Sequence, residues 1–254
     1  MSIIALATML AAINATPQAA VDAYGEAVAR NDPALLARAF EPSAIMYCIQ
    51  DGAIRATYQA QWKTRMRAGT APTGPISTKL QWLDQGTSTA LARATAIRGS
   101  KTFTDYLLLA RIDGSWRVIG KTCQADARYF PASQAAVGAV VDTKLASDRA
   151  WDGDLLAKSI HPRALVMTIE DGELVAATLA EWQARYVDRR TSSSGNAVIE
   201  TSRVVDARGD IGVARWSFRT PAGDIWTDRA LMIRTPAGWR MMALAFAKEV
   251  PTAR

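Results

Sequence analysis

The sequence is poor in the residues that bind metals and perform nucleophilic catalysis. It contains one histidine, His161, and two cysteines, Cys48 and Cys123. This inventory excludes a zinc site of the usual Cys/His type and leaves a Ser-His-Asp triad a single histidine, which follows a predicted helix. There is also no phosphate-binding loop and no Rossmann glycine motif. We therefore expect no metal and no cofactor.

Long apolar runs and clusters of like charge are also absent. No segment reaches the roughly 18 apolar residues of a membrane span, so none is expected. The chain has 254 residues, 49% of them hydrophobic and 21% charged, with a formal net charge of +6. Its basic residues are scattered, and the closest groups, at 63–67 and 185–190, lie at the ends of predicted helices, where the helix dipole favours cations. We therefore expect solvated faces and no nucleic-acid binding.

The first 15 residues are apolar from Ile3 to Ile13. This length suits the core of a secretory signal, and Ile13-Asn14-Ala15 resembles a cleavage site, but no basic residue precedes Arg30. Two interpretations stay open. Residues 1–15 are either a signal peptide, which would place the protein in the periplasm or outside the cell, or an N-terminal extension of a cytoplasmic protein.

The chain contains an internal repeat. Shifted by 120 residues, segment 21–66 aligns without a gap to 141–186 and is identical at 15 of 46 positions. With a shift of 123 residues, 103–118 aligns to 226–241. The matches include residues that form turns, such as Asp-Gly pairs. The residues by which the second repeat is longer fall in loops, where duplicated domains tolerate differences in length. We predict one domain over 16–125 and a second over 133–250.

Each repeat has the same predicted order of elements. In the first repeat, a helix begins at Thr16-Pro17, and a short helix over 33–40 follows a cap at Asp32. In the second repeat, the counterpart of the first helix begins near Ser133-Gln134. A strand over 44–49, a hairpin turn at Asp51-Gly52, a short strand and a third helix come next. Four strands complete the unit, at 76–84, 88–98, 103–112 and 116–124. This order predicts an α+β fold with helices packed on a mostly antiparallel sheet.

This order, closing on the segment FTDYLLLARIDGSWRV, resembles the nuclear transport factor 2-like superfamily. Within it, the chain is similar to the group labelled "putative lumazine-binding", close to the SnoaL-like cyclases. The resemblance covers about 16–125 and 133–248. It implies two cystatin-like cone domains, each with three helices on a strongly curved mixed sheet. Such a cone encloses an apolar pocket, and two cones pack sheet to sheet. We expect a small organic ligand and a monomeric intrachain pseudo-dimer or a homodimer.

The superfamily hosts many activities, so function depends on the residues inside each cone. Ketosteroid isomerase uses a carboxylate base and an oxyanion hole that includes a tyrosine. The resemblance places Tyr24 at the position of that tyrosine and Cys48 at the position of the base. The second repeat has Lys144 and Thr168 at these positions. The missing base argues against ketosteroid-type isomerisation.

The cysteines have two further interpretations. Cys48, in an apolar strand with no base nearby in sequence, is typical of a small buried apolar residue. Alternatively, it forms a disulfide with Cys123, because the first and last strands of this fold are neighbours. Export would favour the bridge. The second repeat has Thr168 and Phe246 instead.

Asp105 and Asp228 occupy equivalent positions, which favours a shared structural role and leaves a pocket carboxylate as the alternative. The repeated tryptophans at 62/182 and 116/239 are typical of core or interface packing, whereas Trp82, Trp151, Trp216 and Trp226 are free to differ in role.

The main hypothesis is a small-molecule-binding protein. The alternative is a lyase, isomerase or cyclase that acts on a carbonyl or aromatic metabolite through Tyr24 and Asp105. A third is an assembly module. The candidate ligand-binding residues are Tyr24, Cys48, Asp105, Lys144 and Asp228, and the first repeat is favoured as the functional one.

Overall fold

A computed structural model describes residues 14–69, 74–192 and 196–249. The described chain forms two similar halves, each with three helices and a six-stranded sheet. The first half contains α1 (Pro17–Arg30), α2 (Pro33–Ala39), β1 (Phe40–Gln50), β2 (Ala53–Tyr58), α3 (Gln59–Ala68), β3 (Ile76–Gln85), β4 (Thr89–Arg98), β5 (Lys101–Ile112) and β6 (Ser115–Ala125). The second contains α4 (Pro131–Ala150), α5 (Gly153–Ser159), β7 (Ile160–Glu170), β8 (Glu173–Thr178), α6 (Leu179–Ser192), β9 (Ile199–Arg208), β10 (Ile211–Arg219), β11 (Ile225–Thr235) and β12 (Gly238–Lys248).

The helix caps that the sequence predicts at Thr16 and Asp32 are present. The Thr16 side chain accepts a hydrogen bond from the Ala19 amide, and Asp32 and Asp152 cap α2 and α5 in the same way. The predicted start of α4 near Ser133 is wrong. This helix begins at Pro131. Proline fits the first helical position because an amide hydrogen there would have no acceptor within the helix.

The Asp-Gly pairs form the tight turns that the sequence predicts. Asp51 and Gly52 have φ values of 49° and 72°, and Asp171 and Gly172 have 51° and 90°. A left-handed backbone at both positions matches the twist of a hairpin, and aspartate and glycine tolerate it best.

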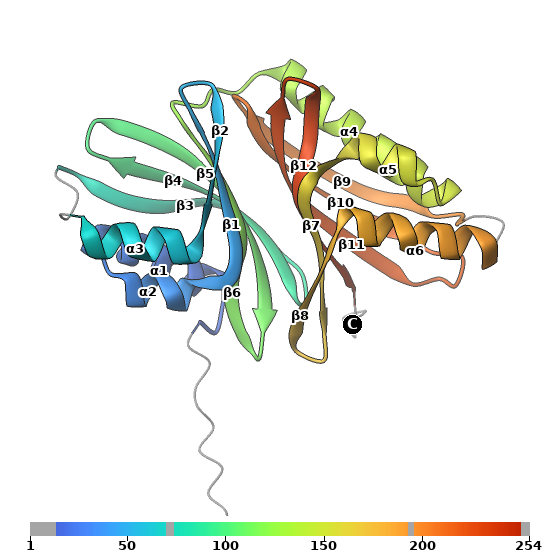
Figure 1. Cartoon of the computed structure of the whole chain (residues 1–254), viewed down its shortest axis with the longest axis horizontal. Helices are drawn as coiled ribbons and strands as arrows, with labels where there is room; N and C mark the ends of the chain where they lie inside the picture. The colour runs from blue at the N-terminus through green and yellow to red at the C-terminus, as the bar shows by residue number, and fades with distance from the viewer. Residues whose placement is uncertain (1–13, 70–73, 193–195, 250–254) are drawn as a thin grey trace, which may run out of the picture.

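Each sheet is mixed. The strand orders are β2-β1-β6-β5-β4-β3 and β8-β7-β12-β11-β10-β9, with one parallel pair in each sheet, β1–β6 and β7–β12. Helices cover one face of each sheet, and an apolar core fills the space between them. The two cones predicted from the sequence are therefore confirmed, and Figure 1 shows them at either side of the molecule.

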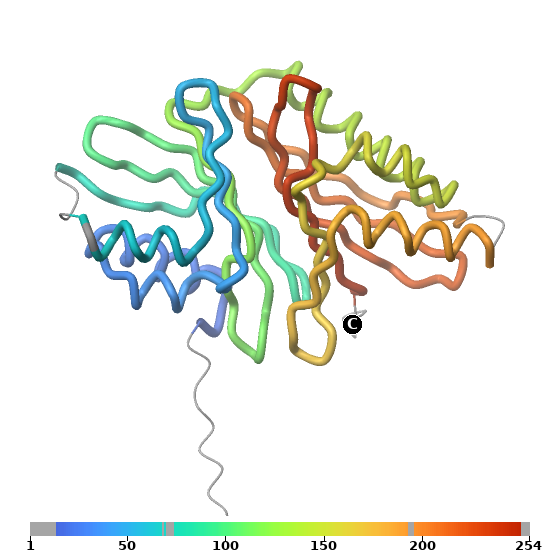
Figure 2. Tube along the Cα trace, in the orientation of Figure 1, coloured from blue at the N-terminus to red at the C-terminus, as the bar shows by residue number. Residues whose placement is uncertain are grey.

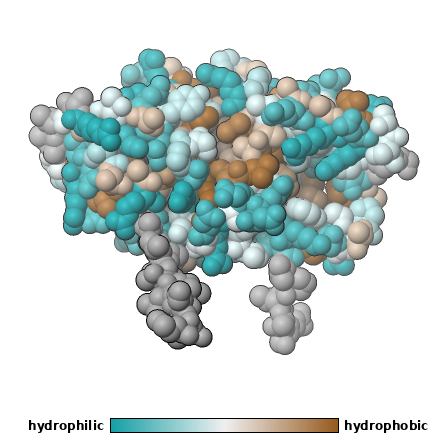
Figure 3. All heavy atoms as spheres, turned by 60° about the horizontal axis from the view of Figure 1, so that its bottom comes forward, coloured by the Kyte–Doolittle hydropathy of each residue, from teal (hydrophilic) through white to brown (hydrophobic). Residues whose placement is uncertain are grey.

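The uncovered faces of the two sheets pack against each other (Figure 2). Their shared apolar cluster includes Leu108 and Ile119 from the first half and Met167 and Leu231 from the second. A Cβ atom on Gly120 would lie 3.2 Å from Leu231 Cδ1, so this position admits only a very small residue. The chain is thus an intrachain pseudo-dimer. Apolar side chains also gather between the two halves on the face drawn in Figure 3.

Asn14 belongs to the first cone. Its side chain is buried and donates hydrogen bonds to the carbonyls of Arg38 (2.9 Å) and Trp116 (3.0 Å), while its own carbonyl accepts from the Trp116 amide at 2.8 Å. Cleavage after Ala15 would remove this residue from the fold. Residues 1–13, on which the two interpretations of the N-terminus otherwise rest, lie outside the described residues. None of the described helices is long and apolar enough to cross a membrane.

Candidate functional site: one cavity in each cone

The first cone contains a cavity of about 460 Å³ on the concave face of its sheet. The strand residues that line it alternate along the chain, because every second side chain of a strand points to the same face. They are Met46, Cys48 and Gln50 on β1, Arg55 and Thr57 on β2, Phe103 and Asp105 on β5, and Lys121 and Cys123 on β6. Arg98 of β4, Ala56, and Trp62 and Arg65 of α3 complete the wall.

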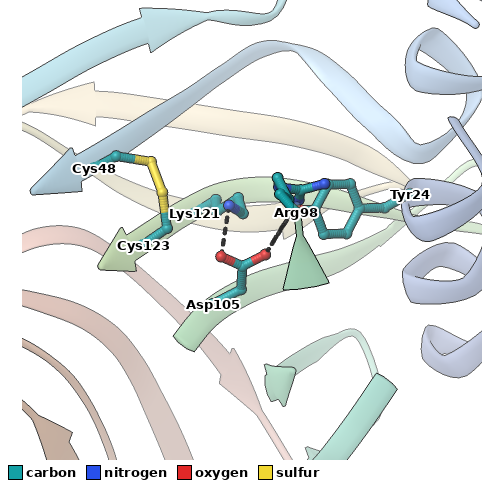
Figure 4. Close-up of a disulfide and its surroundings, with 6 residues drawn as sticks. All are labelled: Tyr24, Cys48, Arg98, Asp105, Lys121 and Cys123. Atoms are coloured by element: carbon teal, nitrogen blue, oxygen red, sulfur yellow. Dashed lines mark hydrogen bonds and ion pairs between the residues drawn. A yellow bond between two sulfur atoms is a disulfide. The ribbon is translucent and has the colours of Figure 1, made fainter. Parts of the chain in front are cut away.

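Four polar side chains meet at the floor of this cavity (Figure 4). Lys121 Nζ donates to Asp105 Oδ1 at 2.9 Å, and the Tyr24 hydroxyl donates to Asp105 Oδ2 at 2.6 Å. Arg98 Nη2 donates to the Tyr24 oxygen at 2.6 Å and lies 3.9 Å from the Asp105 carboxylate. Asp105 and Tyr24 have no exposed surface, and Lys121 is 3% exposed. Both oxygens of the carboxylate therefore have a donor at hydrogen-bond distance.

Burial sets the electrostatics of this cluster. The pKa of Tyr24 is raised well above its ordinary value by burial and by the neighbouring Asp105 carboxylate. The pKa of Lys121 is lowered, because burial disfavours its charge more than Asp105 favours it. Tyr24 is thus held as the neutral phenol.

The two candidate catalytic residues do converge, as an enzymatic role would require, but both are already engaged. The Tyr24 hydroxyl donates a hydrogen bond to Asp105 and accepts one from Arg98, and Tyr24 is not among the residues that line the cavity. Asp105 lines the cavity but holds Lys121 in an ion pair. Both side chains therefore already have partners within the protein. The assignment of these residues to catalysis stays a prediction that the geometry does not favour.

Cys48 and Cys123 form a disulfide in the wall of this cavity. The interpretation of Cys48 as a lone apolar residue is therefore wrong, and the alternative of a bridge is confirmed. The reason is strand register: β1 and β6 run parallel, and Cys48 lies directly opposite Cys123.

Removal of the disulfide should lower the free energy of unfolding. The bridge closes a loop of 75 residues, and for loops of this length we expect the Cys48→Ala/Cys123→Ala variant to lose about 2–4 kcal/mol. Urea denaturation measures the loss. A reducing agent should shift the midpoint of the wild-type protein toward that of the variant and leave the variant unchanged. Insensitivity of both proteins to reduction would contradict the prediction.

The second cone contains a cavity of about 390 Å³ at the equivalent place. Its wall is far more aromatic than that of the first cavity. Trp226 lies on β11, Phe218 on β10 and Phe246 on β12, while Trp182 and Tyr186 lie on α6 and Trp151 directly follows α4. The complete lining is Lys144, Asp148, Trp151, Val166, Trp182, Tyr186, Arg189, Asn196, Phe218, Thr220, Trp226, Asp228, Leu244 and Phe246.

A buried polar cluster also forms the floor of the second cavity. Lys144 Nζ donates to both carboxylate oxygens of Asp148 at 2.7 Å and lies 3.9 Å from Asp228 Oδ2, and the Tyr186 hydroxyl donates to Asp148. Burial opposes the charge of Lys144, but Asp148, Tyr186 and Asp228 outweigh it and raise the pKa of this lysine. Burial raises the pKa of Asp228 to about 7, although Lys144 opposes the shift.

The two clusters contain the same chemical groups on different elements. In the first cone the tyrosine comes from α1 and the lysine from β6; in the second the lysine comes from α4 and the tyrosine from α6. Strand pairing places Leu244 where the first cone has Lys121. Extended one residue beyond the last pair of β10, the same comparison makes Thr220 the equivalent of Arg98. The first cavity is therefore cationic, and the second is aromatic.

Four of the five candidate ligand-binding residues line a cavity: Cys48 and Asp105 in the first, Lys144 and Asp228 in the second. Tyr24 lies behind the first. The repeated Trp62 and Trp182 line the cavities, as do the unpaired Trp151 and Trp226. By contrast, Trp116, Trp216 and Trp239 are buried in the cores of the cones. The described residues contain no group of three His, Cys, Asp or Glu side chains that could hold a metal ion.

The sequence prediction missed Lys121, Arg98, Asp148 and Tyr186. Two of them carried a signal. Lys121 interrupts the apolar strand segment Val118–Cys123, and a buried lysine needs a partner. Asp148 follows Lys144 by four residues, the spacing at which side chains on a helix meet.

The fold and its cavities define a tandem cone protein in which each cone contains a ligand-sized cavity. A sequence model of the family described as "Putative lumazine-binding" matches residues 12–124 and 132–247. Because these two matches cover most of the chain, the protein belongs to this family. No curated protein matches the chain.

Solved structures that resemble the chain include nuclear transport factor 2-like proteins. One, from Silicibacter pomeroyi, is 18% identical, with 42% of this chain and 91% of that protein covered and a TM-score of 0.40. A second, from Shewanella baltica, is 11% identical, with 48% and 98% covered and a TM-score of 0.43. A third, described as a "putative dehydratase" from Streptomyces avermitilis, is 15% identical, with 48% and 100% covered and a TM-score of 0.40.

Proposed function

We propose that the protein binds a planar, heteroaromatic small molecule in the cavity of its second cone. The observation that carries this proposal is the composition of that cavity. Six aromatic side chains surround about 390 Å³, and a lysine and two carboxyl groups lie at the floor. Ligand sites in proteins are concave, largely apolar and supplied with a few polar groups that orient the ligand.

The aromatic walls suit a flat ring system. Trp182 and Trp226 both contact Phe246, with ring centroids 5.4 and 5.8 Å apart. The guanidinium of Arg189 lies 4.8 Å from the centre of the Trp151 ring. Rings held in this way by their neighbours offer preorganised faces for stacking.

The backbone of Trp151 supports a role for this wall. Trp151 ends α4 in the left-handed conformation, with φ of 49°, at the position that Asn31 occupies in the first repeat. Asparagine tolerates this conformation, whereas a bulky residue is strained there, at about 1–3 kcal/mol. Strain of this kind is retained where a side chain serves a site, and Trp151 lines the cavity.

The polar floor supports recognition of both donors and acceptors on a ring. Lys144 is a charged donor, and Asp228, with a pKa of about 7, is present near neutral pH as both the acid and the carboxylate. A pteridine such as lumazine, which the family description mentions, carries donors and acceptors on a flat bicyclic frame. Binding is favoured over catalysis because the paired carboxylate of Asp105 and the engaged Tyr24 leave the enzymatic hypothesis without a free base.

Titration of the protein with lumazine, followed by quenching of tryptophan fluorescence, tests the proposal. We expect saturable binding, and we expect Trp182→Ala to weaken it about tenfold or more, as loss of one stacking face does. Trp62→Ala is the matched control, because Trp62 is the equivalent residue in the first cavity. Its effect should be small.

Three results would reject the proposal. The first is the absence of saturable binding with lumazine and with a second flat bicyclic probe, indole. The second is binding that Trp62→Ala abolishes and Trp182→Ala leaves intact, which would assign the ligand to the first cone. The third is that lumazine quenches the fluorescence of Trp182→Ala and Trp62→Ala to the same extent, which would indicate that it contacts the protein surface and neither cavity.

A further inference from the structure

The cavity of the first cone has an unbalanced charge. Four basic residues line it, against the single carboxylate of Asp105. Lys121 and Arg98 lie at the floor beside Asp105, and Arg55 and Arg65 are exposed at the rim. Within the described chain, neither rim arginine forms an ion pair. A concave surface with this excess of cations concentrates anions.

The floor also has a hydrogen-bond donor without an acceptor. Arg98 uses Nη2 to bind the Tyr24 hydroxyl, whereas its Nη1 is buried and has no partner among the described residues. A buried guanidinium donor without an acceptor is unfavourable, and a ligand oxygen that reached it would recover the lost interaction.

Apart from Gln50 and Thr57, the remaining wall is apolar and sets the shape of the ligand. Met46, Trp62, Phe103 and the disulfide between Cys48 and Cys123 form it. The cavity, at about 460 Å³, is much larger than an inorganic ion needs. The lining therefore suits a molecule with an anionic head and an apolar body.

We propose that the first cone binds organic carboxylates, with the carboxylate near Arg98 and the apolar body against Trp62, Phe103 and the disulfide. This site is separate from the aromatic cavity of the second cone and takes a different class of ligand. The repeat supports the division: Thr220 and Leu244 stand where the first cone has Arg98 and Lys121, so the second cavity lacks these two cations.

Calorimetric titration of the full chain with matched charged and uncharged probes tests this proposal. The charged probes are 2-naphthoate, benzoate and octanoate, and 2-naphthamide is the uncharged isostere of the first. At low salt we expect 2-naphthoate to bind at least about tenfold more tightly than 2-naphthamide, since hydrogen bonds to charged groups are the strong ones. Added salt should reduce this preference.

Two variants locate the site. Arg98→Gln should abolish the preference for the carboxylate. Because Arg98 also contacts Tyr24, the double variant Arg55→Gln/Arg65→Gln provides a test that does not disturb the core, and it should reduce the preference about threefold or more. Arg67→Gln/Arg190→Gln, with two exposed helical arginines that line neither cavity, is the matched control and should bind like the wild type.

The proposal is overturned if none of the three carboxylates binds at millimolar concentration, or if 2-naphthoate has no advantage over its amide. It is also overturned if Trp182→Ala abolishes carboxylate binding while Arg55→Gln/Arg65→Gln does not, because the ligand would then occupy the second cone. If neither lumazine nor indole binds while the carboxylates do, the proposed function of the second cone is rejected and this proposal stands.

Discussion

Lys121→Leu is expected to lower the free energy of unfolding by about 3–5 kcal/mol, the usual effect of leaving a buried charge without its partner. Asp105 has no exposed surface, and its 2.9 Å contact with Lys121 is its closest ion pair. Leucine is the residue at the equivalent position 244, where it is buried, so the fold accepts its shape. Urea denaturation at pH 8 measures the change.

The double variant Lys121→Leu/Asp105→Asn separates lost charge pairing from lost packing. Asparagine is neutral and can still accept the hydrogen bond from Tyr24, so we expect the double variant to regain about half of the stability lost by Lys121→Leu. A double variant no more stable than the single one would show that packing, and not the stranded carboxylate, accounts for the loss.

The sequence predicts the fold well because its signals are local. Asp-Gly turns, the cap at Asp32 and the proline at the start of α1 each act within a few residues, and the Asp cap and the first Asp-Gly turn occur in both repeats. The start of α4 differs by two residues because Phe130 precedes it and makes no side-chain cap. A prolyl residue alone marks that helix start.

The sequence predicts the candidate site only in part because partners come from distant elements. Asp105 and Asp228 are identifiable from the repeat, and both are buried at a cavity floor. Their partners are not repeated: the lysine of the first cone is on a strand, and that of the second is on a helix. An alignment of the two repeats therefore conceals the fact that both cones form a Tyr-Asp-Lys cluster.

The same limitation affected the prediction of the disulfide, whereas the choice of the first repeat as the functional one stays a prediction. Composition alone favours an apolar role for Cys48, and only the register of β1 against β6 brings Cys123 opposite to it. The sequence favours the first repeat because Tyr24 matches a known catalytic position. In three dimensions that tyrosine lies behind the cavity wall, while Trp151, Phe218 and Trp226 of the second repeat converge on one cavity.

Asp228→Asn is expected to remove a large pH dependence of stability. Burial raises the pKa of Asp228 from 3.8 to about 7, against the opposing effects of Lys144 and Arg229 and with a further increase from Asp148. Below pH 3.8 the folded and unfolded states both hold the proton, and the contribution of this group is fully present. Between these two values the folded state binds more protons than the unfolded state, so stability is lost as the pH rises through about 7.

The expected size of this effect is about 4 kcal/mol between pH 4 and pH 8, since each pKa unit corresponds to about 1.4 kcal/mol. Urea denaturation of the wild type and the variant across this range measures it as a difference, which cancels the titration of groups that both proteins share. The free energy of unfolding of the wild type should fall relative to that of Asp228→Asn as the pH rises, and the difference should level off above pH 8.

The pH dependence of ligand binding provides an independent test of the protonation state of Asp228. Below pH 7 the Asp228 carboxyl group can donate a hydrogen bond to a ring acceptor, and above it the carboxylate can only accept one. An uncharged ligand that presents an acceptor to Asp228 should therefore bind more weakly above pH 7 in the wild type, and the Asp228→Asn variant should lose this dependence because its amide remains a donor at every pH. A constant stability difference between the two proteins from pH 4 to pH 8 would instead show that Asp228 is ionised throughout, with Lys144 compensating its burial.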